Sequence, residues 1–243
     1  MPTSRRQRGT RYESSDSESN NHTSRLYTPC PSVTGIIEVK GPIQTCETCN
    51  RFCTPCCFHK DSTCHNCRIV CTDGACSNNG KYGATAGIGI ALGEADDQQW
   101  SLPIDDNLDP GGRRTSQRAE LLAAIVGLDK VAEADGHPDN DEEECCVIIA
   151  TDSEYVVKGM SEWVPTWKAR GWRKSDGRRP SNLDLFRKLD EKVQTLERQN
   201  VFEKISFWRI SRDFNDVADR LAKNGARLAV VSEVEYAISA FDF

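Results

Sequence analysis

The chain has 243 residues, a formal net charge of −6 and 37% hydrophobic residues, enough for one domain with a full core and appended segments. No apolar run reaches the length of a membrane-spanning helix, and the N-terminus lacks the short apolar segment of a secretory signal. We therefore expect an intracellular protein, in the nucleus or the cytoplasm, that is neither secreted nor held in a membrane.

The first 45 residues are rich in serine, arginine, asparagine and acidic residues and offer little to bury. One short apolar stretch, residues 36–39, is either a docked strand or without structure. Because such a composition cannot offset the entropy of ordering, we expect a mostly disordered leader over residues 1–45.

Residues 46–67 hold seven cysteines arranged as three Cys-x-x-Cys pairs and one further thiol. Two such pairs can offer four thiolates to a tetrahedral zinc ion, and the spacing C-x2-C-x14-C-x2-C is close to that of a zinc ribbon. The alternative is a run of thiols in a flexible leader. There are more candidate ligands than one Zn²⁺ needs, so the sequence predicts a structural zinc knuckle over 46–67 without choosing the ligands.

From residue 68 the pattern becomes that of a packed α/β domain, which we place over 68–228. Hydrophobic periodicity predicts strands at about 69–75, 83–92, 98–104, 147–150 and 205–210, and helices at about 116–133, 153–160, 182–197 and 215–227. This order predicts a mixed five-stranded sheet with helices on its faces. The tail, 229–243, is apolar enough to pack back on the domain.

Four carboxylates stand at positions where a rigid scaffold can bring side chains together. Asp73 lies within a strand, Asp152 ends another, and Glu120 and Asp219 lie near the starts of two helices. Taken singly, an acid at a strand end can cap a turn, and one near a helix start can complement the helix dipole. Four acids held together require cations among them, and hard oxygen ligands favour Mg²⁺ or Mn²⁺ over zinc. Two such ions about 4 Å apart can activate a water and stabilise the leaving oxygen of a phosphodiester.

The surrounding residues resemble, in order and spacing, the four signature blocks of the type 1 ribonuclease H family. These blocks are Thr72-Asp73-Gly74, Arg114-Thr115-Ser116-Gln117-Arg118-Ala119-Glu120, Ala150-Thr151-Asp152-Ser153 and Asn215-Asp216-Val217-Ala218-Asp219-Arg220-Leu221-Ala222. The resemblance implies the ribonuclease H-like fold and hydrolysis of the RNA strand of RNA–DNA hybrids, leaving 5′-phosphate and 3′-hydroxyl ends. It also implies that the four acids are the catalytic, metal-binding quartet.

The same resemblance suggests how a hybrid would be held. Asn79 and Gln117 resemble positions that contact the RNA minor groove, although Asn79 could equally be a plain turn residue. Between residues 163 and 180, six basic residues and three tryptophans stand against one acid. Within this stretch, the residues that resemble the family's basic protrusion, which grips the DNA strand, are Lys168, Trp172, Arg173 and Lys174. Three further positions match residues that hold a DNA phosphate in some members: Arg113, Thr115 and Asn182.

Two features depart from the family. Many members carry a histidine in a loop before the Asn-x-x-x-Asp block, whereas this loop is shorter and Arg212 stands nearest to that place. Arg212 cannot shuttle a proton at neutral pH, but it could steer a phosphate. The leader is rich in cysteine, where longer members carry a small hybrid-binding module. We expect an active enzyme that removes RNA from hybrids during replication or transcription, and the alternative is a weak or inactive hybrid-binding protein. No obligate protein partner is evident.

Overall fold

The computed structural model describes residues 24–55, 67–135 and 146–239. Its main sheet has five strands in the order β5-β4-β3-β6-β7. Their bounds are β3 Cys67–Ser77, β4 Thr85–Ala91, β5 Gln99–Pro103, β6 Cys146–Thr151 and β7 Lys204–Arg209. β3 pairs antiparallel with β4 and parallel with β6, so the sheet is mixed, which confirms the predicted fold class.

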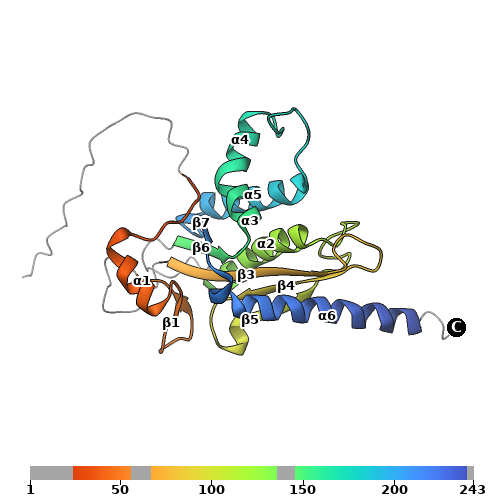
Figure 1. Cartoon of the computed structure of the whole chain (residues 1–243), viewed down its shortest axis with the longest axis horizontal. Helices are drawn as coiled ribbons and strands as arrows, with labels where there is room; N and C mark the ends of the chain where they lie inside the picture. Colours follow the sequence, from red (N-terminus) through yellow and green to blue (C-terminus); the bar gives the residue numbers. More distant parts are fainter. Residues whose placement is uncertain (1–23, 56–66, 136–145, 240–243) are drawn as a thin grey trace, which may run out of the picture.

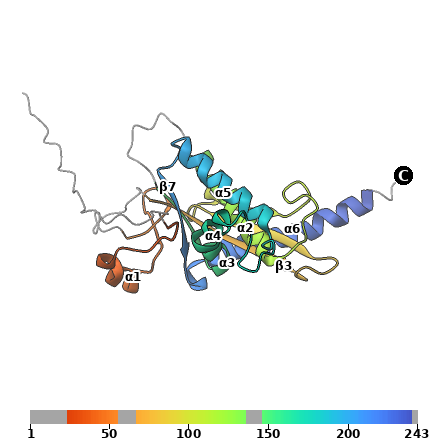
Figure 2. The same cartoon turned by 90° about the horizontal axis from the view of Figure 1, so that it is seen from above.

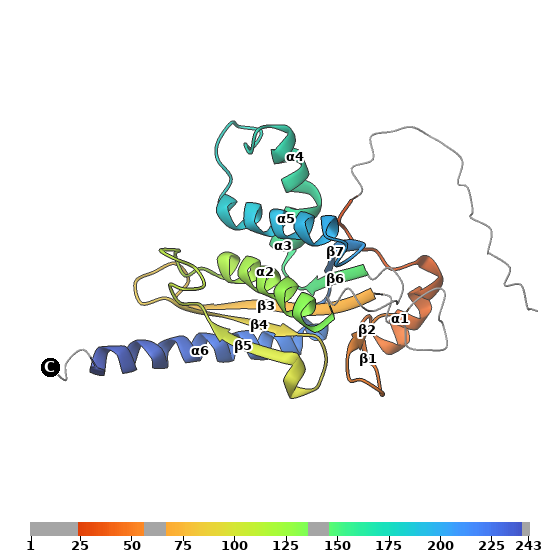
Figure 3. The ribbon, with the colours of Figure 1, turned by 180° about the vertical axis from the view of Figure 1, so that it is seen from behind.

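Helices cover both faces of the sheet (Figures 1 and 3). α2 (Ser116–Asp135) and α5 (Leu183–Arg198) lie on one face, and α6 (Asp216–Ser239) lies on the other. Between β6 and α5 the chain forms α3 (Glu154–Lys158), a π-helical turn (Gly159–Trp163) and α4 (Val164–Ala169). No helix within the described ranges is long and apolar enough to cross a membrane.

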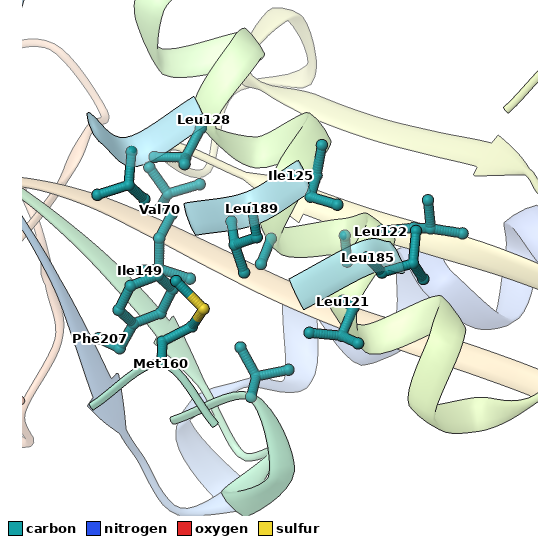
Figure 4. Close-up of a cluster of buried hydrophobic side chains, with 14 of the residues drawn as sticks. Val70, Leu121, Leu122, Ile125, Leu128, Ile149, Met160, Leu185, Leu189 and Phe207 are labelled. Atoms are coloured by element: carbon teal, nitrogen blue, oxygen red, sulfur yellow. The ribbon is translucent and has the colours of Figure 1, made fainter. Parts of the chain in front are cut away.

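The main core lies between the sheet and the helices α2 and α5 (Figure 4). Val70, Ile149 and Phe207 come from three neighbouring strands and are fully buried. Leucines and isoleucines of α2 and α5 pack over them, among them Leu121, Leu122, Ile125, Leu128, Leu185 and Leu189. Truncating one such side chain costs about 2–5 kcal/mol, so this core fixes the strands β3 and β6, which position Asp73 and Asp152.

The other face of the sheet is covered partly by α6 and partly by residues 24–54, which we call the docked leader. This segment contains α1 (Thr34–Lys40) and a small hairpin of β1 (Gln44–Thr45) and β2 (Phe52–Cys53). Figure 1 shows α1 and β1 at the end of the sheet where β3 begins. Phe52 is buried there in a second core with Ile69 and Trp208.

The docked leader joins the sheet through backbone contacts. Tyr27 N donates to Phe207 O at 2.9 Å, and Phe207 N donates to Arg25 O at 2.7 Å, so the segment adds a short parallel pairing beside β7. Just after β4, Leu92 O accepts a hydrogen bond from Phe52 N at 2.8 Å. The sequence predicted a mostly disordered leader over 1–45; residues 24–45 instead pack on the domain, because their few apolar and aromatic side chains have a sheet face to cover. Residues 1–23 lie outside the described ranges.

The predicted elements shift mainly at their ends. The helix expected at 153–160 ends at Lys158, where the π-helical turn begins. The helix expected to end at residue 227 continues to Ser239, and Figures 1 and 2 show it running past the end of the β3–β4 hairpin. The tail therefore prolongs α6 as far as Ser239 and does not turn back on the domain.

Candidate active site

Asp73 and Glu120 lie side by side because a glycine lets a helix approach the sheet. Asp73 sits in the middle of β3 and is 6% exposed. At the next residue, Gly74, a Cβ atom would overlap the backbone of Ala119 and Glu120. The first turns of α2 therefore rest directly on β3, and Glu120 is placed beside Asp73.

A second close approach positions Asp219. The register partner of Asp73 on β4 is Gly89. A Cβ atom there would overlap the carbonyl oxygen of Ala218 and the amide nitrogen of Ala222. The start of α6 therefore lies against β4 opposite Asp73, which brings Asp219 toward the same point from the other face.

Asp152 follows the last residue of β6, which runs parallel to β3. Its neighbour Ser153 caps α3, since its Oγ accepts a hydrogen bond from Val156 N. The same Oγ atom donates to Glu120 Oε2 at 2.5 Å, so the residue that follows Asp152 in the chain holds the Glu120 carboxylate.

Asn215 hydrogen-bonds to two segments that carry acids of the quartet, and the sequence analysis predicted no role for it. Asn215 is 1% exposed, and its Nδ2 donates to Thr72 O and to Asp152 Oδ1, both at 3.1 Å. Its backbone oxygen accepts from Asp219 N at 2.9 Å. One side chain thus links β3, the end of β6 and the start of α6. The signal was available: an asparagine one turn before Asp219 is a helix-capping position.

The electrostatics of the quartet are those of acids held too close together. Burial raises the pKa of Asp73 to about 7, with further increases from Asp152, Asp219 and Glu120. Burial also raises the pKa of Glu120, against the lowering effects of the Ser153 hydrogen bond and of Arg212. A raised pKa means that the ionised cluster lacks sufficient positive charge.

Two basic side chains reach this cluster. Arg212 Nε lies 3.5 Å from Asp152 Oδ2, and Arg212 Nη2 lies 3.5 Å from Asp219 Oδ1. Lys223, one turn after Asp219 on α6, lies 2.6 Å from Asp219 Oδ2. The quartet is therefore partly neutralised from the side of Asp152 and Asp219.

The donor set fits a hard divalent cation, because all four side chains offer oxygen atoms and the raised pKa of Asp73 reports uncompensated negative charge. Within the described part of the chain, no three acid, histidine or cysteine side chains are arranged so that they could hold a metal ion as they stand. As the structure stands, Asp152 and Asp219 form ion pairs with Arg212, and Asp219 also forms one with Lys223. Metal binding would require these two acids to turn from the bases toward the ion.

Five of the predicted substrate contacts line one open hollow next to the quartet. Its volume is about 740 Å³, and its lining includes Asn79, Arg113, Thr115, Gln117 and Asn182. Asn79 Oδ1 accepts from Ser116 N at 3.1 Å, so this side chain also holds the start of α2. Asn182 has a left-handed backbone with φ of 52° and donates to the Tyr155 hydroxyl at 3.1 Å.

The four residues predicted for the basic protrusion are not equivalent. Lys174 lines a second hollow with Trp163 and Trp167. Trp172 packs partly against the core and lies under the guanidinium of Arg187, 4.7 Å from its ring centroid. Lys168 Nζ lies 2.9 Å from a carboxylate oxygen of the buried Asp190, so it also balances a buried charge.

Arg173 Nη1 donates to Gly177 O at 3.0 Å and braces the loop after α4. Lys174 Nζ lies 3.9 Å from Asp176 Oδ2, so all four residues of this basic lobe, residues 163–180, also have contacts within the protein. Whether any of the four touches a nucleic acid stays a prediction.

The cysteine region is only partly described. Cys46, Cys49, Cys53 and Cys67 fall within the described residues, whereas Cys56, Cys57 and Cys64 lie outside them. The first Cys-x-x-Cys pair forms the β1–β2 turn, where Asn50 N donates to Cys46 O at 2.9 Å. The zinc knuckle stays a prediction, and all four histidines also lie outside the described ranges.

Comparison with known proteins gives a consistent result. The sequence matches the model of the RNase H family over residues 65–227. A ribonuclease H of Photorhabdus laumondii is 31% identical over 167 residues, which cover 69% of this chain and 93% of that protein. Ribonuclease H1 of Rattus norvegicus is 34% identical over 159 residues, which cover 65% of this chain and 50% of the rat protein.

Among solved structures, that of LC11-RNase H1 in complex with an RNA/DNA hybrid matches with a TM-score of 0.45 and 22% identity, covering 67% of this chain and 98% of that one. The sequence matches are the stronger of the two kinds of similarity.

Proposed function

The chain belongs to the ribonuclease H family of hydrolases, and from this premise we propose that it cleaves the RNA strand of RNA–DNA hybrids in a reaction that depends on divalent metal. We further propose a two-metal mechanism that leaves 5′-phosphate and 3′-hydroxyl ends. Mg²⁺ is the proposed ion, and Mn²⁺ is a proposed substitute because it also prefers oxygen ligands.

One observation carries the proposal: Asp73, Glu120, Asp152 and Asp219 converge from both faces of one sheet. The two glycine contacts bring α2 and α6 onto the strands beside Asp73, and Asn215 joins the elements that carry the other acids. A fold has no structural need for four acids at one point, since burial, together with repulsion from the other three acids, raises the pKa of Asp73 to about 7.

The chain's own residues would hold and orient the reacting groups. The quartet would bind the cations, with Asp73 as the most enclosed ligand. Bound divalent ions would supply an activated water and charge stabilisation for the leaving oxygen. Ser153 would restrain the Glu120 carboxylate and Asn215 that of Asp152 through the hydrogen bonds that each donates, while Asp152 and Asp219 would turn from Arg212 and Lys223 to reach the ion.

Substrate would lie across the hollow beside the quartet. Asn79 and Gln117, which line this hollow, would contact ribose hydroxyls of the RNA strand, and such contacts are how a protein distinguishes RNA from DNA. Arg113, Thr115 and Asn182 line the same hollow and would receive a phosphate of the DNA strand. Lys174 and its neighbours in the basic lobe would hold the DNA further along.

Three finer points belong to the same proposal. The cellular role would be removal of RNA from hybrids formed in replication or transcription, inside the nucleus or the cytoplasm. The cysteines of residues 46–67 would bind a structural Zn²⁺. Metal analysis of protein purified without chelator tests the proposed zinc site. Less than about 0.2 zinc per chain would contradict it, because one structural ion per chain is expected.

The activity is tested with end-labelled RNA annealed to DNA, with RNA duplex and single-stranded RNA as controls. Wild type should cut only the hybrid, and only with Mg²⁺ or Mn²⁺. Asp73→Asn should reduce the rate at least about a thousandfold, because it removes the ligand at the centre of the quartet. Asp96→Asn is the matched control, because Asp96 is an exposed aspartate in the turn before β5, outside the quartet and the proposed substrate contacts. End-group analysis of the products tests the predicted 5′-phosphate.

The alternative is a hybrid-binding protein with weak or no turnover. Arg212, at the place where many family members carry a histidine, is the observation that favours it. Tight binding of the hybrid without cleavage in either Mg²⁺ or Mn²⁺ would contradict the enzyme and support the binder.

A further inference from the structure

Arg212 is the feature of the site that the proposed chemistry does not use. It begins a single 3₁₀ turn, Arg212–Phe214, between β7 and α6. Asn215 N donates to Arg212 O at 3.0 Å, so the turn is closed by the same residue whose side chain holds Asp152. Its backbone is thus fixed relative to the quartet.

The docked leader lies against this turn. A Cβ atom at Gly41, just after α1, would lie 3.1 Å from the ring of Phe214, so the two segments are already in contact. The 3₁₀ turn, the start of α6 and the leader residues Ile43 and Phe52 surround a small hollow. The leader therefore packs against the turn that carries Arg212, whose own side chain is 73% exposed and can move.

The guanidinium of Arg212 bridges two acids of the quartet. It reaches Asp152 and Asp219 with two different nitrogens, at 3.5 Å each. Lys223 reaches only Asp219. A divalent ion shared by Asp152 and Asp219 would need the same oxygen atoms and the same space between them.

We propose that Arg212 is a built-in cation that competes with divalent metal for Asp152 and Asp219 and thereby sets the metal concentration at which the site fills. This inference rests on the proposed metal-dependent function. Without metal, Arg212 reduces the repulsion between the two acids. When metal binds, the arginine leaves the acids, and its exposed side chain can do so without disturbing the core.

The expected size of the effect follows from simple electrostatics. A unit charge several ångströms from a divalent ion in a water-exposed site changes the affinity by roughly threefold to tenfold, after screening by salt. Removing Arg212 should therefore tighten metal binding, although the same change removes a favourable ion pair from the metal-free protein. Lys223 should have a smaller effect because it contacts a single acid.

The test is calorimetric titration of the metal-free full chain with Mn²⁺ and with Mg²⁺, in the absence of nucleic acid. Arg212→Gln should lower the dissociation constant roughly threefold to tenfold. Arg212→Lys keeps the charge and should stay closer to wild type, and Lys223→Gln should fall in between. Arg209→Gln is the matched control, because this substitution removes the same charge outside the quartet. Arg209 Nη1 lies 3.5 Å from Glu154 Oε2.

A second measurement uses the hybrid. The Mg²⁺ concentration that gives half-maximal cleavage should fall in Arg212→Gln by the factor found in calorimetry. Equal metal affinity in Arg212→Gln and Arg209→Gln, or weaker affinity in Arg212→Gln, would overturn the competition. If wild type binds neither ion, the proposed metal-dependent function fails together with this inference; if wild type binds metal and cleaves, only the inference is at stake.

Discussion

Two partly desolvated carboxylates, Asp73 and Glu197, have pKa values shifted in opposite directions. At the quartet, burial raises the pKa of Asp73 to about 7, and the neighbouring acids add to the effect. At the seam between the docked leader and the sheet, Glu197 of α5 is also desolvated, yet its pKa is lowered, because Arg25 and the amide of Ile205 hydrogen-bond to it. Asp73 therefore lacks a full counter-charge, whereas Glu197 has Arg25 as its counter-charge.

The difference separates a structural ion pair from a binding site. Arg25 meets Glu197 with two nitrogens, at 2.7 and 2.9 Å, and the arginine comes from the segment that the pair fastens to the domain. At the quartet, Arg212 and Lys223 form ion pairs with Asp152 and Asp219, and no basic side chain of the described residues forms one with Asp73 or Glu120. Negative charge that the fold leaves uncompensated is charge available to a ligand cation.

The largest change expected from one substitution that leaves all four acids in place is at Asn215. Asn215→Ala removes both hydrogen bonds that hold Asp152 and Thr72 and should lower the free energy of unfolding by about 2–3 kcal/mol. Cleavage should fall at least about a hundredfold, since the acids lose their alignment.

Asn224→Ala is the control for this prediction, because Asn224 lies on the same helix and its side chain donates to Ser101 away from the quartet. Chemical denaturation and single-turnover cleavage measure the two effects. Loss of stability with unchanged cleavage would mean that Asn215 holds the fold without aligning the acids.

The next prediction concerns pH in the presence of a chelator. The pKa of Asp73 is raised above its ordinary value of 3.8, so between about pH 4 and pH 7 the folded protein holds a proton that the unfolded chain has lost. Stability of the metal-free protein should therefore fall as pH rises through this range, by about 1–3 kcal/mol in total.

Asp73→Asn should remove this fall and be the more stable protein at pH 8 without metal, and Mg²⁺ should stabilise wild type but not the variant. Melting temperatures at pH 5.5 and pH 8, with chelator and with Mg²⁺, give the four values needed. A fall of equal size in both proteins would assign the effect to other groups.

The leader seam should respond to pH in the opposite direction. The lowered pKa of Glu197 contributes stability that is present above about pH 4.5, the ordinary value for a glutamate, and is lost as pH falls through the folded-state pKa. Arg25→Ala and Glu197→Gln should each destabilise the protein by about 1–2 kcal/mol, and the double variant by less than the sum.

This double-mutant cycle is read by denaturation, with hydrogen exchange at Tyr27 and Phe207 to locate the opening. Additive effects would mean that the pair does not fasten the leader. Unchanged exchange at both residues would have the same meaning.

The smallest effect should come from the exposed basic lobe. Lys174→Ala should weaken hybrid binding about twofold to fivefold and reduce the dependence of binding on log[salt] by about one unit, with no change in stability. Lys40→Ala, on α1 and outside both hollows, is the control for loss of one surface charge. Equal effects of the two variants would show that Lys174 acts through net charge alone.

The sequence was sufficient for the sheet, for most of its helices and for the four acids. Strands and helices were recognisable because their apolar residues recur with the period of each element, and the acids stood in four blocks whose order and spacing resemble one family. Element ends were less accurate: the strand around Asp73 extends from Cys67 to Ser77, and α6 continues to Ser239. Ends depend on pairing and packing partners that the local pattern does not contain.

By itself, then, the sequence determined the sheet, since strands and helices are encoded in short, local patterns, and it singled out four acids whose metal binding stays a prediction. Only the tertiary structure decided that Asn215 holds Asp152 and Thr72, the latter 143 residues away in the chain. The same holds for Arg212 between two acids, for Arg25 on Glu197 and for the leader against the sheet. These contacts join residues that are distant in the chain, and no periodicity records them because they exist only once the strands and helices have packed.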